Sequence, residues 1–174
     1  PATGLQPITH EALWLMKRVG SPAVSPDGRW AVFPVTEPAY DEKKETQDLW
    51  VVPVDGSAKA RRLTSGRAGE GAPAWSPDSR RIAFTAKRDD DEVAQVYVLD
   101  FAAGGEARRV TSSPLAARGP LWSPDGAAIA YLWDTRMDRE SGRIGKTQGR
   151  FLQALSYLAL VADGSDQKSE YRER

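Results

Sequence analysis

The sequence predicts an all-β fold, and three observations carry that prediction. A Ser-Pro-Asp turn motif occurs three times, at residues 25–27, 76–78 and 123–125. Each copy is followed by a short apolar run typical of a strand, at residues 30–33, 82–85 and 129–132. Two further landmarks share one period, since Trp50 to Tyr97 and Thr64 to Thr111 are each separated by 47 residues. Because a repeat of this length with four short strands is typical of a propeller blade, we predict a partial β-propeller of four-stranded antiparallel blades with a short N-terminal helix.

The helix is predicted within an N-terminal segment, residues 1–20. Thr9 is a good N-cap, Ile8 and Leu13 suit a hydrophobic staple around it, and Gly20 is the expected end of the helix. The helix carries apolar residues that need a surface to cover, namely Leu13, Trp14, Met16 and Val19. We therefore expect the segment 8–19 to dock on another part of the protein.

The blades are predicted to occupy residues 21–174. Blade one spans about 21–68 and blade two about 69–115, and an incomplete blade three spans 116–174. In each blade the first strand ends just before the Ser-Pro-Asp motif and the second follows it. The third contains the aromatic and aliphatic run, and the fourth ends in Arg-Arg-Leu-Thr or Arg-Arg-Val-Thr. Blade three departs from this pattern, with an insertion at 134–150, a third strand predicted within 157–164 and no fourth-strand motif.

The Ser-Pro-Asp-Gly motif has a mechanical explanation. Proline presets the first central position of a type I turn, aspartate suits the second, and glycine takes the left-handed position that follows. Blade two has Ser79 at the glycine position, which is unfavourable if that residue is left-handed.

Six aromatic residues occupy corresponding blade positions. A cofactor cage or a base-stacking platform is one interpretation, but side chains that fill the gap between stacked blades are favoured. These residues are Trp50, Trp75, Phe84, Tyr97, Trp122 and Tyr131.

Composition excludes several functions. The 24 basic and 24 acidic residues cancel, so no strong field draws nucleic acid or an anionic membrane. No apolar stretch approaches the ~18 residues of a membrane span. The chain has no cysteine, which excludes thiolate catalysis and cysteine-based zinc sites. We expect a cytoplasmic location, with a periplasmic one as the alternative.

Four groups of residues are candidate sites, and we favour a structural explanation for each. His10 suits an exposed position in the first helical turn. The acidic run 89–92 lacks the ligand spacing of a calcium loop and suits a solvated hairpin tip.

The glycines at 66, 69 and 71 precede a strand rather than a helix, so they are interpreted as an inter-blade connection and not as a phosphate loop. The two side chains of each pair, Arg61-Arg62 and Arg108-Arg109, point to opposite faces of their strand, which argues against a basic patch for nucleic acid. We predict no catalytic, cofactor-binding or metal-binding residue and no cofactor.

The insertion in blade three is rich in basic residues. A solvated loop on a propeller rim is the favoured interpretation, and contact with another domain or with a peptide carboxylate is the alternative. The basic residues are Arg136, Arg139, Arg143, Lys146 and Arg150.

The N-terminal region carries a family resemblance. The text from Ile8 to Pro22, joined to Val24-Ser-Pro-Asp-Gly28, resembles the start of bacterial acylaminoacyl-peptidases and dipeptidyl-aminopeptidases of the prolyl oligopeptidase family. The regions 48–56 and 87–89 are similar to the same group, and the resemblance covers about residues 5–133. It implies a propeller that admits peptides to a following α/β-hydrolase domain with a Ser-Asp-His triad. No Gly-x-Ser-x-Gly elbow occurs here, so the triad is not carried over and the isolated chain is expected to be inactive.

Three functions are consistent with these residues. The leading one is the N-terminal propeller portion of a serine exopeptidase, with a hydrolase domain and a peptide substrate as partners. The second is a TolB-like propeller that binds proteins without catalysis. The third is a structural module that completes its ring as a homo-oligomer, because three blades leave two faces and two edges uncovered.

Overall fold

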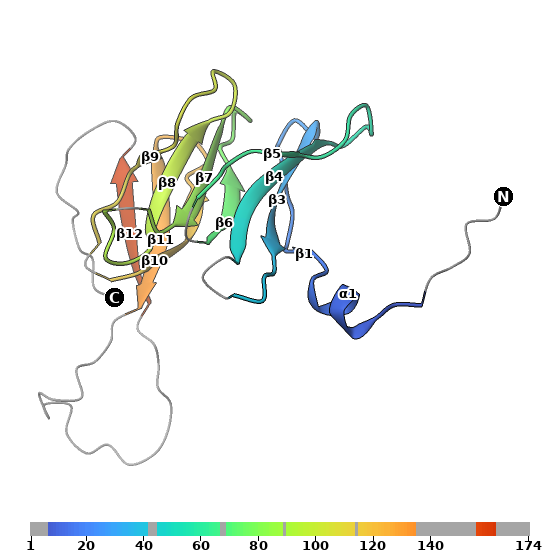
Figure 1. The fold of residues 1–174 in the computed structure, drawn as a ribbon. Helices are drawn as coiled ribbons and strands as arrows, with labels where there is room; N and C mark the ends of the chain where they lie inside the picture. Colours follow the sequence, from blue (N-terminus) through green and yellow to red (C-terminus); the bar gives the residue numbers. More distant parts are fainter. Residues whose placement is uncertain are drawn as a thin grey trace, which may run out of the picture.

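The computed structural model describes residues 7–41, 45–66, 69–88, 90–113, 115–134 and 156–162. These residues form one short helix and three antiparallel sheets that lie side by side without closing into a ring (Figure 1). The predicted all-β fold, a partial β-propeller of antiparallel blades with a short N-terminal helix, is confirmed, and blade two has the four strands that were predicted. The charged insertion predicted at 134–150 lies outside the described residues apart from Asp134.

Each sheet keeps the order of its strands in the sequence. The sheet of blade one pairs in the order β1-β3-β4-β5 with β2 also on β3, blade two in the order β6-β7-β8-β9, and blade three in the order β10-β11-β12. The strands of blade one are β1 (Arg18–Val19), β2 (Ala23–Val24), β3 (Trp30–Glu37), β4 (Thr46–Pro53) and β5 (Arg61–Arg62). Those of blade two are β6 (Glu70–Trp75), β7 (Arg81–Ala86), β8 (Gln95–Asp100) and β9 (Arg108–Arg109). Those of blade three are β10 (Ala117–Trp122), β11 (Ala128–Asp134) and β12 (Ser156–Ala162).

The N-terminal helix is shorter than predicted. Helix α1 spans His10–Trp14, and the Thr9 hydroxyl accepts a hydrogen bond from the Ala12 amide at 3.1 Å, as expected of an N-cap. The predicted end at Gly20 is wrong, because Arg18 and Val19 form β1 and pair with β3. The Gly20 amide continues this pairing by donating to the Pro34 carbonyl at 2.8 Å. Partnership with β3 therefore outweighs the helical pattern of the local sequence.

Each Ser-Pro-Asp motif closes its turn with the same side-chain contacts. In blade two the Ser76 hydroxyl donates to the Asp78 carboxylate at 2.5 Å and accepts from the Arg81 amide at 2.9 Å. Asp78 also accepts from the Arg80 amide at 3.0 Å. The equivalent contacts are present in blades one and three. The serine and aspartate of the motif therefore bond to each other as well as to the backbone.

Ser79 adopts the left-handed conformation that the turn requires. Its φ is 58°, close to the 71° of Gly28 and the 68° of Gly126. The Ser79 hydroxyl accepts a hydrogen bond from the Asp27 amide of blade one at 3.1 Å. A contact between blades thus offsets part of the backbone strain at this position.

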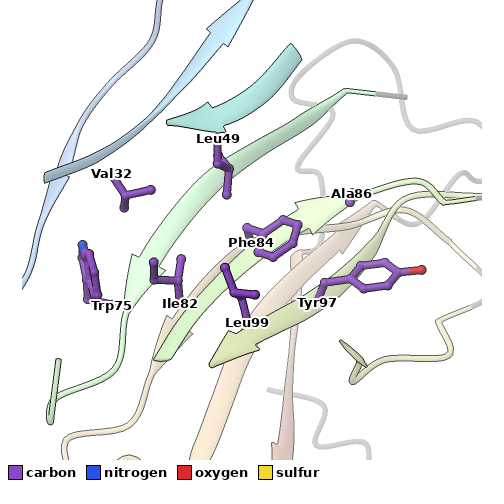
Figure 2. Close-up of a cluster of buried hydrophobic side chains, with 8 residues drawn as sticks. All are labelled: Val32, Leu49, Trp75, Ile82, Phe84, Ala86, Tyr97 and Leu99. Atoms are coloured by element: carbon purple, nitrogen blue, oxygen red, sulfur yellow. The ribbon is translucent and has the colours of Figure 1, made fainter. Parts of the chain in front are cut away.

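The core lies between the blades. The cluster shown in Figure 2 joins Val32 and Leu49 of blade one to a set from blade two, namely Trp75, Ile82, Phe84, Ala86, Tyr97 and Leu99. A second cluster joins the opposite face of blade two to blade three through Ala83, Val96, Val98, Ala117, Trp122, Ile129 and Tyr131. Five of the six aromatic residues named from the sequence belong to these clusters, and the sixth, Trp50, is half-buried on blade one.

The first strand of each blade is interrupted at the same place. In blade one a break separates β1 from β2, and in β6 and β10 the register shifts after Gly71 and after Arg118. A proline lies three residues before each turn serine, at Pro22, Pro73 and Pro120. Because proline lacks the amide that a ladder needs, it favours such irregularities. These prolines repeat with the same spacing as the turns, and sequence reasoning missed them.

Candidate functional site

The first candidate surface is the exposed side of helix α1. None of its residues is buried, and Trp14 retains 50% exposure in spite of its size. The neighbouring apolar side chains are exposed as well. We call this group the apolar helix surface, and it consists of Ile8, Leu13, Trp14, Leu15 and Met16. Helix α1 stands outside the sheets, beside blade one (Figure 1).

Polar contacts attach the helix region to blade one. The Lys17 ammonium pairs with Glu37 at the end of β3, at 2.6 Å, and lies 5.4 Å from the ring centre of Trp50. Desolvation and a hydrogen bond with Glu11 of α1 raise the pKa of Tyr40 above its ordinary value. Polar side chains therefore hold the helix to its own blade while its apolar side chains face solvent. This arrangement is the reverse of ordinary amphipathic packing and makes the apolar helix surface a candidate for contact with another structure.

The second candidate is an ion-pair network in blade two. Glu70 at the start of β6 pairs with Arg88 at 2.8 Å, and Asp91 pairs with Arg109 of β9 at 2.8 Å. Asp91 also accepts from the Tyr97 hydroxyl at 2.6 Å, and the Arg88 guanidinium lies 4.9 Å from the Tyr97 ring centre. The network therefore links the β7–β8 connection to strands β6, β8 and β9.

The expectation that residues 89–92 form a solvated tip is wrong for Asp91. Asp91 is only 7% exposed, because Tyr97 and Arg109 fold over its carboxylate. Asp90 and Glu92 are exposed, and Asp89 lies outside the described residues. No group of three or more histidine, cysteine or acidic side chains placed to hold a metal occurs in the described part of the chain.

The network and the turns predict a loss of stability in acid. Burial raises the pKa of Asp91, but hydrogen bonds from Tyr97, the Arg88 amide and Arg109 outweigh it and hold that pKa below its ordinary value. The serine hydroxyl in each turn likewise lowers the pKa of Asp27, Asp78 and Asp125. Carboxyls with lowered folded pKa values stabilise the fold above about pH 4, and this contribution is lost as the pH falls through the folded values.

Urea unfolding at a series of pH values checks this expectation. The free energy of unfolding should fall steadily from pH 5 to pH 2, and Asp91→Asn should flatten part of that fall. An unfolding free energy that is unchanged or higher at pH 2 would contradict it. Above pH 9 the Tyr97 hydroxyl also affects the free energy of unfolding. Burial and the hydrogen bond to Asp91 raise the pKa of Tyr97 to about 12.

The other candidate residues have structural roles or exposed positions. His10 is the exposed first residue of α1. The second arginine of each pair forms an ion pair, Arg62 with Asp48 and Arg109 with Asp91. Gly71 lies inside β6, so its assignment to the connection before the strand is wrong. The Gln47 side chain packs against this backbone and donates to the Glu70 carbonyl at 3.0 Å, which leaves little room for a side chain at position 71.

The threonine that ends each Arg-Arg-x-Thr motif has a role that sequence reasoning missed. The Thr64 hydroxyl accepts from the Leu49 amide at 3.0 Å, and Thr111 accepts from the Val96 amide at 2.9 Å. Each threonine thus completes the outer edge of the third strand of its blade. The signal was its repetition at the same spacing as the aromatic run.

Comparison with known proteins places these features in context. Residues 14–160 match the family model described as the TolB beta propeller domain. Dipeptidyl-peptidase 5 of Porphyromonas gingivalis is 40% identical over 77 residues, which are 44% of this chain and 11% of that protein. The resemblance to peptidases inferred from the sequence is confirmed by this match. The chain thus spans only a small part of the length of its curated relative.

Solved structures share the fold. The acylaminoacyl peptidase of Pyrococcus horikoshii aligns with 92% of this chain and 26% of its own, at a TM-score of 0.61 and 16% identity. TolB of Acinetobacter baumannii aligns with 89% of this chain and 31% of its own, at a TM-score of 0.54 and 18% identity. Among the described residues no helix is long and apolar enough to cross a membrane.

Proposed function

The chain belongs to the TolB β-propeller domain family, and on that premise we propose that it is the N-terminal propeller portion of a serine exopeptidase of the acylaminoacyl or dipeptidyl type. In this role it gates the access of peptides to an α/β-hydrolase domain carried elsewhere in the same polypeptide. The observation that carries the proposal is the 40% identity to a protein named as a dipeptidyl-peptidase.

The blades supply shape and rigidity to this function. Stacked sheets joined by buried aromatic side chains form a stiff wall, and a closed ring of such walls admits extended peptides while excluding folded proteins. The residues described here therefore position and select the substrate. The nucleophile, base and oxyanion donors belong to the hydrolase domain.

In this proposal the hydrolase domain docks on the apolar helix surface. Its polar attachments to blade one, Lys17 with Glu37 and Glu11 with Tyr40, fix the helix direction while its apolar side chains face solvent. Covering those side chains with an apolar surface of the hydrolase domain is favourable by the ordinary hydrophobic effect. The helix then couples the position of the propeller to that of the catalytic domain.

The activity is tested on the full-length polypeptide that contains this chain. We expect it to hydrolyse dipeptidyl or acylaminoacyl p-nitroanilides, with the activity abolished by a serine-directed reagent, while this chain alone is inactive. Absence of both a Gly-x-Ser-x-Gly elbow and hydrolysis in the full-length protein would contradict the proposal.

The docking role is tested separately, by Trp14→Asp in the full-length protein. This change should lower kcat/KM and expose the junction of the two domains to limited proteolysis, while leaving the stability of this chain unchanged because Trp14 is exposed. Val54→Asp, at an exposed apolar residue beyond the end of β4, is the matched control and should have no effect. Equal effects of the two variants would contradict a docking role for the helix.

A TolB-like binding module is the second candidate. The family match and the alignment with the Acinetobacter TolB structure favour it. It predicts that the full-length protein has further blades, lacks a hydrolase domain and binds other proteins without turnover.

A further inference from the structure

The first strand of each blade contains the same bulge, in which two residues lie opposite one aromatic residue of the second strand. The bulges and their aromatic partners are residues 21–22 opposite Phe33, 72–73 opposite Phe84 and 119–120 opposite Tyr131. The second residue of every bulge is a proline. Because the bulge recurs at the same point of all three blades, it is part of the repeat and not a local defect.

The bulge of blade two persists in spite of an unfavourable backbone conformation. Ala72 has a φ of 49°, and Gly119, 47 residues later in blade three, has a φ of 56°. This left-handed conformation suits glycine and is unfavourable for alanine. The strand pairing on both sides of Ala72 therefore holds the bulge even where the residue type opposes it.

The first strands of neighbouring blades lie side by side. The Trp75 indole N–H donates to the Ala23 carbonyl of blade one at 3.0 Å, and the Trp122 indole N–H donates to the Ala74 carbonyl of blade two at 3.1 Å. All four residues belong to first strands, and β6 contacts β2 on one side and β10 on the other. The first strands therefore converge along one side of the three blades.

Each first strand is also an edge of its sheet. Strands β6 and β10 begin their sheets, and β1 and β2 both pair with β3 only. We call these three edges the inner edges, and the first bulge residues Ser21, Ala72 and Gly119 are exposed on them. An open sheet edge presents unpaired N–H and C=O groups, which form a template for an added strand.

The bulge divides every inner edge into pieces that are too short to hold an added strand. In blade two the regular pieces on either side of the bulge are residues 70–71 and 74–75, and β1 and β2 of blade one have two residues each. The extra residue shifts the alternation of backbone groups and increases the local twist. A straight strand that pairs with one piece therefore does not match the other, and the proline removes an amide N–H between them.

We propose that the bulge and its proline form an edge guard, which keeps extended peptides from adding to the inner edges as a further strand. Peptides that join a sheet edge gain their affinity from main-chain hydrogen bonds, so an unguarded edge would hold many different sequences. A peptide held in this way would stay on the propeller instead of passing along it. The inference rests on the proposed function only in naming peptides as the chains that pass.

Four variants of blade two test the edge guard on this chain. Deletion of Pro73 removes the extra residue and the proline together. Deletion of Ala72 removes the extra residue and keeps the proline, whereas Pro73→Ala removes the proline and keeps the extra residue. Ala72→Gly keeps both and is the matched control, because glycine suits the left-handed conformation at this position.

The probe is a fluorescein-labelled peptide of alternating threonine and valine, about six residues long, whose binding is measured by fluorescence anisotropy. The chain without Pro73 should bind it about tenfold more tightly than the unaltered chain, because several main-chain hydrogen bonds form along a continuous edge. The chain without Ala72 and Pro73→Ala should each gain less, and Ala72→Gly should gain nothing. A peptide of the same sequence with every backbone nitrogen methylated cannot pair and should bind none of them.

The inference is overturned if the chain without Pro73 folds but binds the probe no more tightly than the unaltered chain. It is also overturned if Ala72→Gly gains as much, or if the methylated peptide binds equally well. Urea unfolding shows whether each variant folds, and if deletion of Pro73 prevents folding, deletion of Pro120 in blade three should give the same gain.

Failure of both deletions to fold would make the bulge a requirement of blade packing and would overturn the inference as well. Because none of these measurements involves peptide hydrolysis, the inference and the proposed function fail separately.

Discussion

Replacing Trp75 by alanine should lower the free energy of unfolding by about 3–5 kcal/mol. Trp75 is 8% exposed and lies between blades one and two, where its ring contacts Phe101 edge-on at a centroid distance of 4.9 Å. The substitution removes this packing and the hydrogen bond to Ala23 together. Because neighbouring strands are fixed by their own sheets, they relax little into the space that is left.

Urea denaturation measures this effect, with two control variants. Trp75→Phe keeps most of the ring but loses the N–H, so its loss should be clearly smaller. Trp14→Ala removes an equally large ring from an exposed position and should change stability by less than about 1 kcal/mol. A loss below about 1 kcal/mol for Trp75→Ala would mean that the ring does not fill a gap between blades.

Removing the partner of Glu70 should be comparably damaging. The Glu70 side chain is fully buried, and Arg88 pairs with its Oε1 atom. Its Oε2 atom has no hydrogen-bond partner among the described residues. Arg88→Met therefore leaves a buried carboxylate without a countercharge, for which a loss of about 3–5 kcal/mol is expected.

Two further variants separate the charge from the packing. Arg88→Met combined with Glu70→Gln should recover much of the lost stability, because the uncompensated charge is gone. Lys17→Met breaks an exposed ion pair and should lose less than about 1 kcal/mol. If Arg88→Met is no worse than Lys17→Met, the buried pair does not stabilise blade two.

The repeat made the blades predictable, because each turn and strand is specified by residues close together in the sequence. The Ser-Pro-Asp motif predicted the hairpin in which it lies, and the aromatic residues predicted which surfaces pack between blades. Thr9 identified the start of α1 for the same local reason.

The features that sequence reasoning missed depend on partners far along the chain. Residues 18 and 19 continue the local helical pattern, yet they pair with Thr36 and Val35 and become a strand. Asp91 looked solvated within an acidic run, yet Arg109, 18 residues later, neutralises and covers it. The indole-to-carbonyl bonds join residues about one repeat apart, and the repeat alone gave the spacing but not the contact.

Hydrogen exchange of the tryptophan indoles, followed by NMR on this chain, tests the stacking of the blades most directly. The Trp75 and Trp122 indole N–H groups donate between blades and should exchange far more slowly than that of the exposed Trp14. If all three exchange at the rate of a free indole, the sheets do not stack in the way described.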